Sequence, residues 1–284
     1  MALCLLCIGV AVPGTAPADD QTTVTLVSTT STDNSGLLDV LLPAFTARTG
    51  IRVRLIAVGT GQALRIGRSG DADVLIVHHE VSELAFVNAG FGVARQPIME
   101  NDFVIVGPAD DPARIRGSAA AAAAMARIAE TGTAFVSRGD ESGTHFRELE
   151  LWTAAGLDPA AGRSGWYRET GSGQGANLNV ASAMSAYALT DRATWMNFAN
   201  KGPLEILVEG DPRLRNAYAA ILVNPARHPH VQADNGRALI DWLTSAEGRS
   251  LINAYRIDGR QAFFTVAPEP SESDSTSDKR GTQP

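Results

Sequence analysis

Runs of β-branched and apolar residues alternate along the chain with short polar loops and with apolar stripes at helical spacing. Residues 22–27 alternate as a strand does, and residues 28–36 follow as a loop that is dense in hydroxyl groups. From Leu37 an apolar stripe predicts a helix that Gly50 ends and that Pro43 should kink. The first part of the chain therefore predicts a strand, a polar loop and a helix in succession.

Three further loops of small polar residues open predicted helices. Residues 52–58 form a predicted strand that runs into the loop 59–62. A second such loop covers 137–144, and the glycine-rich run 171–176 opens a helix that we expect to continue through Tyr187 to Asp191. The remaining pattern predicts strands at 74–77, 101–106, 204–208 and 219–223 and helices at 83–88, 113–129, 148–155, 235–243 and 247–255.

The loop at 137–144 has the composition of an anion site. Backbone N–H groups at a helix start carry partial positive charge and point outward. The small residues Ser142, Gly143 and Thr144 let an anion approach that backbone closely. Ser137, Ser142 and Thr144 add hydroxyl donors.

Arg138 gives this loop a planar and permanent positive charge. Asp140 is placed either to orient Arg138 through a charge-assisted pair or to cap the helix. An ordinary helix start with one surface arginine would explain the same residues equally well, so the loop alone leaves both interpretations open.

The loop after the first strand carries five consecutive hydroxyl residues, at 28–32. Ser and Thr favour N-caps and turns, but one cap needs only one hydroxyl. The surplus indicates a second set of donors for an anion.

Composition and charge narrow the class of partner. The chain has 284 residues, enough for one large or two medium domains, and its 44% hydrophobic residues lie in the globular range. The formal charge of -7 argues against a nucleic-acid partner, which would require a basic face. An acidic protein can still bind an anion, because the local field of the site decides.

The two ends of the chain differ from the rest. Residues 1–18 form an apolar run with an Ala-x-Ala ending, which is typical of an export signal although no Lys or Arg precedes it. The run is too short to span a bilayer. It contains both cysteines, Cys4 and Cys7, so disulfides do not indicate the compartment. Residues 267–284 are rich in Pro, Ser, Asp, Glu and Thr and predict a disordered tail.

Three other motifs give weaker signals. The run 171–176 fits a G-x-G-x-x-A dinucleotide fingerprint, but it lies late in the chain and Asp191 is expected to end a helix. The His-His-Glu run at 78–80 could hold a metal ion, but adjacent residues rarely face one ion, and a surface loop is the simpler interpretation. Ser142 and His145 share a helix turn without a third acid or a G-x-S-x-G elbow, which disfavours a serine hydrolase.

Several stretches, in order along the chain, resemble the tungstate-binding periplasmic proteins of ABC transporters. They are Ser28–Leu42, Val58–Leu64, Asn101–Pro108, Ser137–His145 and Ala186–Arg192. The similarity extends over residues 22–264, nearly the whole chain after the export signal. The Thr-Thr-Thr-Ser signature of that family falls on residues 28–31, where its first Thr is Ser, so the hydroxyl is kept and a methyl group is lost.

The resemblance implies an α/β protein with the two-lobed periplasmic-binding-protein fold of type II. The ligand cleft would lie between the lobes, and two crossing strands would form the hinge. Lobe 1 would comprise residues 22–102 and 217–266, and lobe 2 would comprise residues 103–216. The polar loops of the two lobes would then meet around the ligand on closure.

The resemblance also implies a binding protein rather than an enzyme, which captures tungstate or molybdate and delivers the oxyanion to the membrane permease of an ABC transporter. We expect an exported, periplasmic monomer without a cofactor, a nucleic-acid partner or a side chain that binds a metal ion directly. The expected oxyanion ligands are Ser28, Thr29, Thr30, Ser31, Thr60, Ser137, Arg138, Ser142, Gly143, Thr144 and Gly173.

A phosphate-binding protein of the same fold is the main alternative, and an effector-sensing domain or a serine hydrolase is more remote. Phosphate at neutral pH still carries a proton, so its site needs a buried acceptor, whereas tungstate needs donors only. Asp33 and Asp140 are the obvious acceptors in the loops. An unpaired Asp in the cleft would favour phosphate, and engagement of Asp140 by Arg138 or by backbone would favour tungstate.

Overall fold

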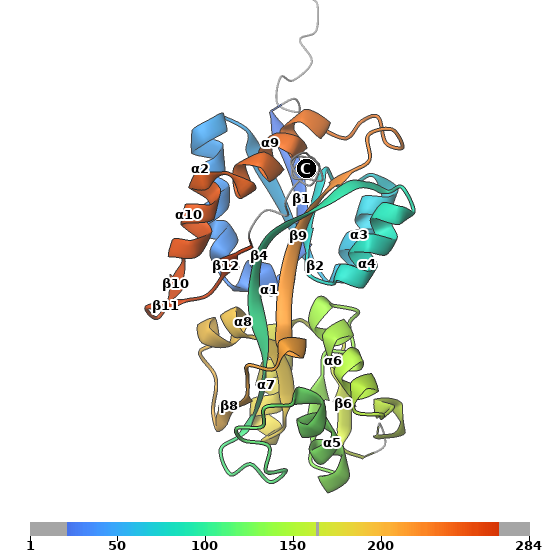
Figure 1. Cartoon of the computed structure of the whole chain (residues 1–284), viewed down its shortest axis with the longest axis vertical. Helices are drawn as coiled ribbons and strands as arrows, with labels where there is room; N and C mark the ends of the chain where they lie inside the picture. Colours follow the sequence, from blue (N-terminus) through green and yellow to red (C-terminus); the bar gives the residue numbers. More distant parts are fainter. Residues whose placement is uncertain (1–21, 163–164, 267–284) are drawn as a thin grey trace, which may run out of the picture.

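The computed structural model describes residues 22–162 and 165–266, which form two α/β lobes joined by two long strands (Figure 1). The predicted export signal at 1–18 and the predicted tail at 267–284 lie outside the described residues. Within the two described ranges, no helix has the length and the apolar character needed to cross a membrane.

Lobe 1 is built on three parallel strands in the order β3-β1-β2: β1 (Thr23–Thr29), β2 (Arg52–Val58) and β3 (Val74–Val77). Its helices are α1 (Thr30–Asn34), α2 (Leu37–Thr49), α3 (Thr60–Ser69), α4 (Glu80–Asn88), α9 (Ala233–Thr244) and α10 (Ala246–Ala254). One core contains Phe45 and Trp242, and a second contains Leu64 and Phe86. Because parallel strands end at the same edge of a sheet, the residues that follow β1, β2 and β3 lie together.

Strands β4 (Gly92–Pro108) and β9 (Arg215–Val223) run antiparallel and pass from one lobe to the other (Figure 1). In lobe 1, β9 pairs with β3 and β4 pairs with β12 (Phe264–Thr265); in lobe 2, β4 pairs with two further strands. Both strands are longer than predicted, and β4 takes part in two sheets, one in each lobe. Asn101 pairs with Asn216 beside the predicted lobe boundaries, which stay predictions.

Lobe 2 contains the helices α5 (Ala121–Thr131), α6 (Gly143–Ala154), α7 (Gln174–Met184) and α8 (Arg192–Asn197). Its strands are β5 (Phe135–Ser137), β6 (Tyr167–Glu169), β7 (Ala188–Asp191) and β8 (Leu204–Val208). Short 3-10 turns cover Pro159–Gly162 and Pro212–Leu214. After α10 of lobe 1, β10 (Arg256–Ile257) and β11 (Arg260–Gln261) form a hairpin that precedes β12. Phe135, Trp152 and Tyr187 belong to the main core of lobe 2.

Two predicted helices have other bounds in the structure. The helix predicted at 113–129 begins only at Ala121, because left-handed backbone at Asp111, Arg114 and Gly117 holds the preceding residues in turns. The helix predicted through Tyr187 ends at Met184, and the next residues form strand β7.

The position of Asp191 was therefore predicted wrongly, since it ends a strand and not a helix. The apolar residues before it pair with β4, and this long-range pairing prevails over the helical spacing. A smaller error concerns residues 30–34, which form the short helix α1 instead of an open loop. Thr29 caps that helix by accepting a hydrogen bond from the Thr32 N–H.

Candidate functional site

The starts of four helices meet where the lobes face each other: α1 and α3 from lobe 1, and α6 and α7 from lobe 2. The N–H of Gly61 donates to the carbonyl of Glu141 at 3.0 Å. A Cβ placed on Gly59 would lie 3.2 Å from the Asp140 carbonyl, and one on Gly173 would lie 4.0 Å from Thr30 Oγ1. The fold thus brings the four polar loops that the sequence singled out to one junction.

Arg138 lies in this junction with 1% of its surface exposed. Its Nη2 lies 2.5 Å from Asp140 Oδ2. Longer contacts of 3.4 Å reach the Ser172 carbonyl, Gln174 Oε1 and Thr30 Oγ1. Burial lowers the pKa of Arg138 and Asp140 raises it, but a guanidinium stays protonated in either case. Most of its donors are in long contacts, so the group can still bind an anion tightly.

The hydroxyl groups of Thr60 and Thr144 are buried, and within the described part of the chain neither has a hydrogen-bond partner. A buried hydroxyl without a partner costs about 1–3 kcal/mol. Thr60 is the first residue of α3, and Thr144 lies in the first turn of α6, so each hydroxyl accompanies free backbone N–H groups. Each lobe therefore offers donors that a ligand oxygen would satisfy.

The hydroxyls that follow β1 are linked to one another. Thr29 Oγ1 lies 3.0 Å from Ser31 Oγ and 2.7 Å from Thr32 Oγ1. Ser28 differs, because its hydroxyl donates to the Ile76 carbonyl at 3.0 Å. The proton of Ser28 is used inside lobe 1, so this geometry does not support its predicted role as a donor to the ligand.

The helix α6 fixes the remaining predicted residues of lobe 2. Ser142 caps this helix, and its Oγ accepts from the His145 N–H at 3.2 Å. Ser137 is wholly buried, and its Oγ has no hydrogen-bond partner among the described residues, as is also the case for Thr60 and Thr144. A Cβ on Gly143 would lie 2.5 Å from the ring of a lobe 1 histidine, so only glycine fits there.

The geometry of Ser142 and His145 is that of a helix cap. The His145 Nδ1 accepts from the Glu141 N–H at 3.2 Å, while the Ser142 hydroxyl accepts from a backbone N–H. Both side chains thus bind backbone groups, and the hydrogen bond between nucleophile and base that a serine hydrolase uses is not formed here.

Two carboxylates at the junction are fully engaged. Asp140 accepts from Arg138 and, through Oδ1, from the Ser142 N–H at 3.2 Å. Asp191 is wholly buried and accepts from the N–H and the hydroxyl of Thr194 at 2.9 and 2.6 Å. Burial raises the pKa of Asp191, and the bonds from Thr194 oppose that rise. Neither acid is an unpaired acceptor of the kind that would favour phosphate.

His78 is the main residue that sequence reasoning missed. We predicted a surface loop there, but His78 is 4% exposed and lies against Gly143 of the other lobe. Its Nδ1 lies 2.9 Å from Asn216 Oδ1, and its Nε2 lies 3.1 Å from Ser31 Oγ. Burial lowers the pKa of His78 to about 3. Its position directly after β3 could have indicated this role, because the residues that follow β1, β2 and β3 lie at the same edge of the sheet.

Gln174, the first residue of α7, is a second missed residue. It is wholly buried, its Nε2 donates to the Leu189 carbonyl at 3.1 Å, and its Oε1 faces Arg138. The glycines around it drew attention to the loop but gave no reason to select this side chain.

The predicted alternative of a metal site at 78–80 receives no support from the geometry. Whereas His78 points to Ser31 and Asn216, His79 binds Ser82 at 2.7 Å and Glu150 at 3.2 Å. Over residues 22–162 and 165–266, no group of three or more His, Cys, Asp or Glu side chains could hold a metal ion.

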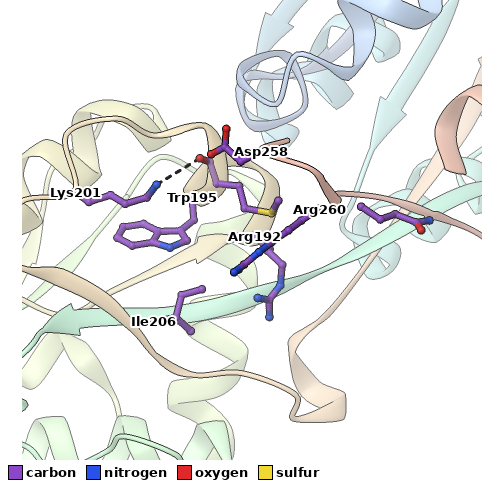
Figure 2. Close-up of a pocket in the computed structure, with 8 residues that line it drawn as sticks. Arg192, Trp195, Lys201, Ile206, Asp258 and Arg260 are labelled. Carbon is purple, nitrogen blue, oxygen red and sulfur yellow. Dashed lines mark hydrogen bonds between the residues drawn. The ribbon is translucent and has the colours of Figure 1, made fainter. Parts of the chain in front are cut away.

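A separate pocket, with a volume of about 360 Å³ and a mixed polar and apolar lining, is shown in Figure 2. It is lined by Arg192, Trp195, Met196, Lys201, Ile206, Asp258, Arg260 and Gln261. Arg192 is held by both oxygens of Asp102 at 2.7 Å and by Glu209 at 2.6 Å, and Lys201 lies 5.3 Å above the Trp195 ring. These cations are already bound, so this pocket is a weaker candidate for an oxyanion.

A family model and several known proteins match this chain. A sequence model of the PBP superfamily domain matches residues 12–247. The chain is 44% identical over 234 residues to the tungstate-binding protein TupA of Peptoclostridium acidaminophilum, and this match covers 82% of this chain and 81% of that protein.

Two solved structures are also similar. The tungstate ABC transporter protein from Geobacter sulfurreducens has a TM-score of 0.75 and 47% identity, covering 82% of this chain and 98% of that one. The tungstate-binding protein TupA from Desulfovibrio alaskensis G20 has a TM-score of 0.74 and 45% identity, covering 86% of this chain and 99% of that one.

Proposed function

The chain belongs to the family of tungstate-binding, solute-binding proteins of ABC transporters, and from this membership we propose that it captures tungstate or molybdate between its two lobes. The observation that carries the proposal is the buried guanidinium of Arg138 beside two buried threonine hydroxyls that lack partners. One cation and a set of donors suit a small dianion that carries no proton.

We assign the ligand contacts to both lobes. Lobe 1 would contribute Thr29, Thr30, Ser31 and Thr60, and lobe 2 would contribute Arg138, Thr144 and the backbone N–H groups at Gly143 and Gly173, whereas the Ser142 N–H already donates to Asp140. Ser28 would support the site from behind, because its hydroxyl donates to the Ile76 carbonyl, whereas the buried Ser137 hydroxyl, without a partner among the described residues, would add a donor from lobe 2. Each charge-assisted hydrogen bond contributes roughly 1.5–3 kcal/mol, so several together reach nanomolar affinity after ordering costs.

Tungstate and molybdate are favoured over phosphate by the state of the acids. Phosphate would present a proton, and a buried acceptor would have to receive it. Asp140 is bound to Arg138 and to the Ser142 N–H, and Asp191 is bound to Thr194. Asp33, on α1, is only half-buried, and burial beside Asp39 raises its pKa. A hydrogen phosphate would therefore have to donate to a carboxylate that is already bound or to a hydroxyl, which is weaker than donation to a free carboxylate.

Membership of this family supports a role in transport rather than in catalysis. The bound oxyanion would hold the lobes closed, and the closed protein would deliver it to the membrane permease of an ABC transporter. An exported, periplasmic location fits that role. A serine hydrolase is disfavoured because Ser142 caps α6 and does not bind His145 as a nucleophile binds its base.

Titration calorimetry of the full chain with tungstate, molybdate, phosphate and sulfate near neutral pH tests this proposal. We expect tight binding of tungstate and molybdate, and phosphate should give no heat at the same concentrations. Tight phosphate binding would show that an acid in the site is available as an acceptor. No binding of any of the four anions would contradict the proposed function itself.

A further inference from the structure

The hydrogen bonds around His78 define which of its nitrogens carries the proton. Asn216 directs Oδ1 toward His78 Nδ1, because its Nδ2 donates to Asn101 Oδ1 at 2.8 Å and to the Tyr218 hydroxyl at 2.9 Å. An oxygen that faces Nδ1 accepts a hydrogen bond, so Nδ1 carries the hydrogen and Nε2 presents a lone pair.

That lone pair faces Ser31, one of the residues that we assign to the oxyanion. At 3.1 Å, the Ser31 hydroxyl therefore donates to Nε2 of His78. Thr29 Oγ1, 3.0 Å from Ser31 Oγ, then donates to Ser31. In this arrangement the hydroxyl protons of Thr29 and Ser31 point toward His78, whereas binding of an oxyanion requires them to point at the oxyanion.

The surroundings of His78 fix its ring and keep it neutral. The ring lies between Tyr218, at 4.8 Å between centroids, and the backbone of Gly143. The charged and titratable groups that act on it are His79 beside it and Arg138 and Arg147 from lobe 2, and all of these oppose a positive charge. Together with burial they keep the pKa of His78 well below its usual range.

A bound dianion would change both the charge near His78 and the direction in which Ser31 donates. It offsets the positive charge of Arg138, which is one of the groups that oppose protonation of His78. It also requires the proton of Ser31, and a Ser31 that donates to the ligand leaves Nε2 without a partner in a buried place. Both effects favour a hydrogen on Nε2.

We propose that His78 is a positioning residue for the oxyanion: on binding, its Nε2 becomes a donor to Ser31, so that Ser31 donates its own proton to the ligand. The inference rests on the proposed function. The hydrogen reaches Nε2 by one of two balanced routes. The imidazole gains one proton from solvent and becomes an imidazolium, or it loses the proton of Nδ1 as it gains one at Nε2. In the second route the Asn216 amide turns to donate from Nδ2 to His78, and the Asn101 amide turns with it, so that its Nδ2, which has no partner among the described residues, donates to Asn216 Oδ1.

Long-range ¹⁵N–¹H spectra of histidine-labelled full chain test this directly, with His78→Gln used to assign the signal. Without ligand we expect a neutral His78 with the hydrogen on Nδ1. With saturating tungstate we expect Nε2 to be protonated, with or without a hydrogen on Nδ1. An unprotonated Nε2 in the complex would overturn the inference.

A double-mutant cycle with Ser31 separates positioning from simple packing. His78→Leu should weaken tungstate binding by about 10- to 30-fold, and His78→Gln, which keeps a donor N–H, should recover part of the loss. In a Ser31→Ala background the same His78→Leu change should cost less than about threefold, because the group that His78 orients is gone. Equal losses in both backgrounds, or no loss at all, would contradict the role.

The controls distinguish the two proposals. Thermal unfolding without ligand shows whether the Leu variant is folded, and the spectra of the unmutated chain do not depend on that variant. If the unmutated chain binds neither tungstate nor molybdate, the proposed function and this inference both fail. If it binds them with Nε2 unprotonated, only the role of His78 fails.

Discussion

Arg138 and Arg192 both lie near the lobe junction and both contact carboxylates, but they differ in how many of their donors are used. Arg192 makes three contacts of 2.6 to 2.7 Å with Asp102 and Glu209, beside the pocket of Figure 2. Arg138 makes one short contact, with Asp140, and its other contacts are 3.4 Å long. Arg192 thus joins parts of the fold, whereas Arg138 keeps donors for a ligand.

The comparison shows that an arginine in a pocket is not by itself an anion site. The carboxylates around Arg192 bring two negative charges to one cation, and the hydrogen bonds with Asp102 and Glu209 raise its pKa above the usual range although burial lowers it. Around Arg138, the acid in direct contact is Asp140, while Asp191 and Glu148 act on the guanidinium through their charge.

Arg138→Ala should abolish most of the tungstate affinity while the fold persists. Loss of a buried charge with its hydrogen bonds should weaken binding by roughly 10³-fold or more, as measured by calorimetry. Arg138→Lys should give an intermediate affinity, because it keeps the charge but loses the planar fork. Arg260→Ala, in the pocket of Figure 2, is the matched control and should bind as the unmutated chain does. The reverse ranking would move the site to that pocket.

Glu148 is a buried acid that acts on Arg138, and it should make the stability of the fold depend on pH. Burial raises the pKa of Glu148 from 4.5 to about 7, against hydrogen bonds from Tyr167 and Trp152. Because the folded pKa is the higher one, the protonated acid stabilises the fold below pH 4.5, and this contribution is lost as pH rises through 7.

Between pH 5 and pH 8 the free energy of unfolding should therefore fall by up to about 3 kcal/mol more in the unmutated chain than in Glu148→Gln. Denaturant unfolding of both proteins across this range measures the difference. Parallel pH profiles would mean that Glu148 is ionised in the folded protein at all of these values.

Gly143→Ala should block the approach of the two lobes. The new Cβ would lie 2.5 Å from the His78 ring, and overpacking of this kind costs about 1–3 kcal/mol. Tungstate affinity should fall by roughly 10- to 100-fold in calorimetry. Gly175→Ala, where a Cβ would have open space, is the control. Unchanged affinity in Gly143→Ala would show that the bound state does not need this close contact.

Thr60→Val and Thr144→Val should give the smallest effects and should act in opposite directions on binding and on stability. Each removes one donor at nearly constant shape, so affinity should fall by about tenfold. Unfolding without ligand should be unchanged or slightly harder, because a buried hydroxyl without a partner is removed. A variant that loses stability but keeps its affinity would show that the hydroxyl serves the fold and not the ligand.

Local sequence patterns accounted for much of the molecule. The hydroxyl run at 28–32 and the glycine-flanked helix starts identified all four loops at the junction, because small and polar residues must stand where backbone approaches a ligand. The same patterns failed for His78 and Gln174, since their roles depend on contacts with residues far away in the chain. The error at Asp191 has the same origin, because the pairing of β7 with β4 overrides local helical spacing.

The most direct test is a crystal structure of the full chain grown with tungstate, in which anomalous scattering locates the tungsten atom. We expect one tungsten atom at the junction, with its oxygens within hydrogen-bond distance of Arg138, Thr60 and Thr144. A tungsten atom in the pocket between Arg192 and Arg260, or at a site that contacts one lobe only, would contradict it.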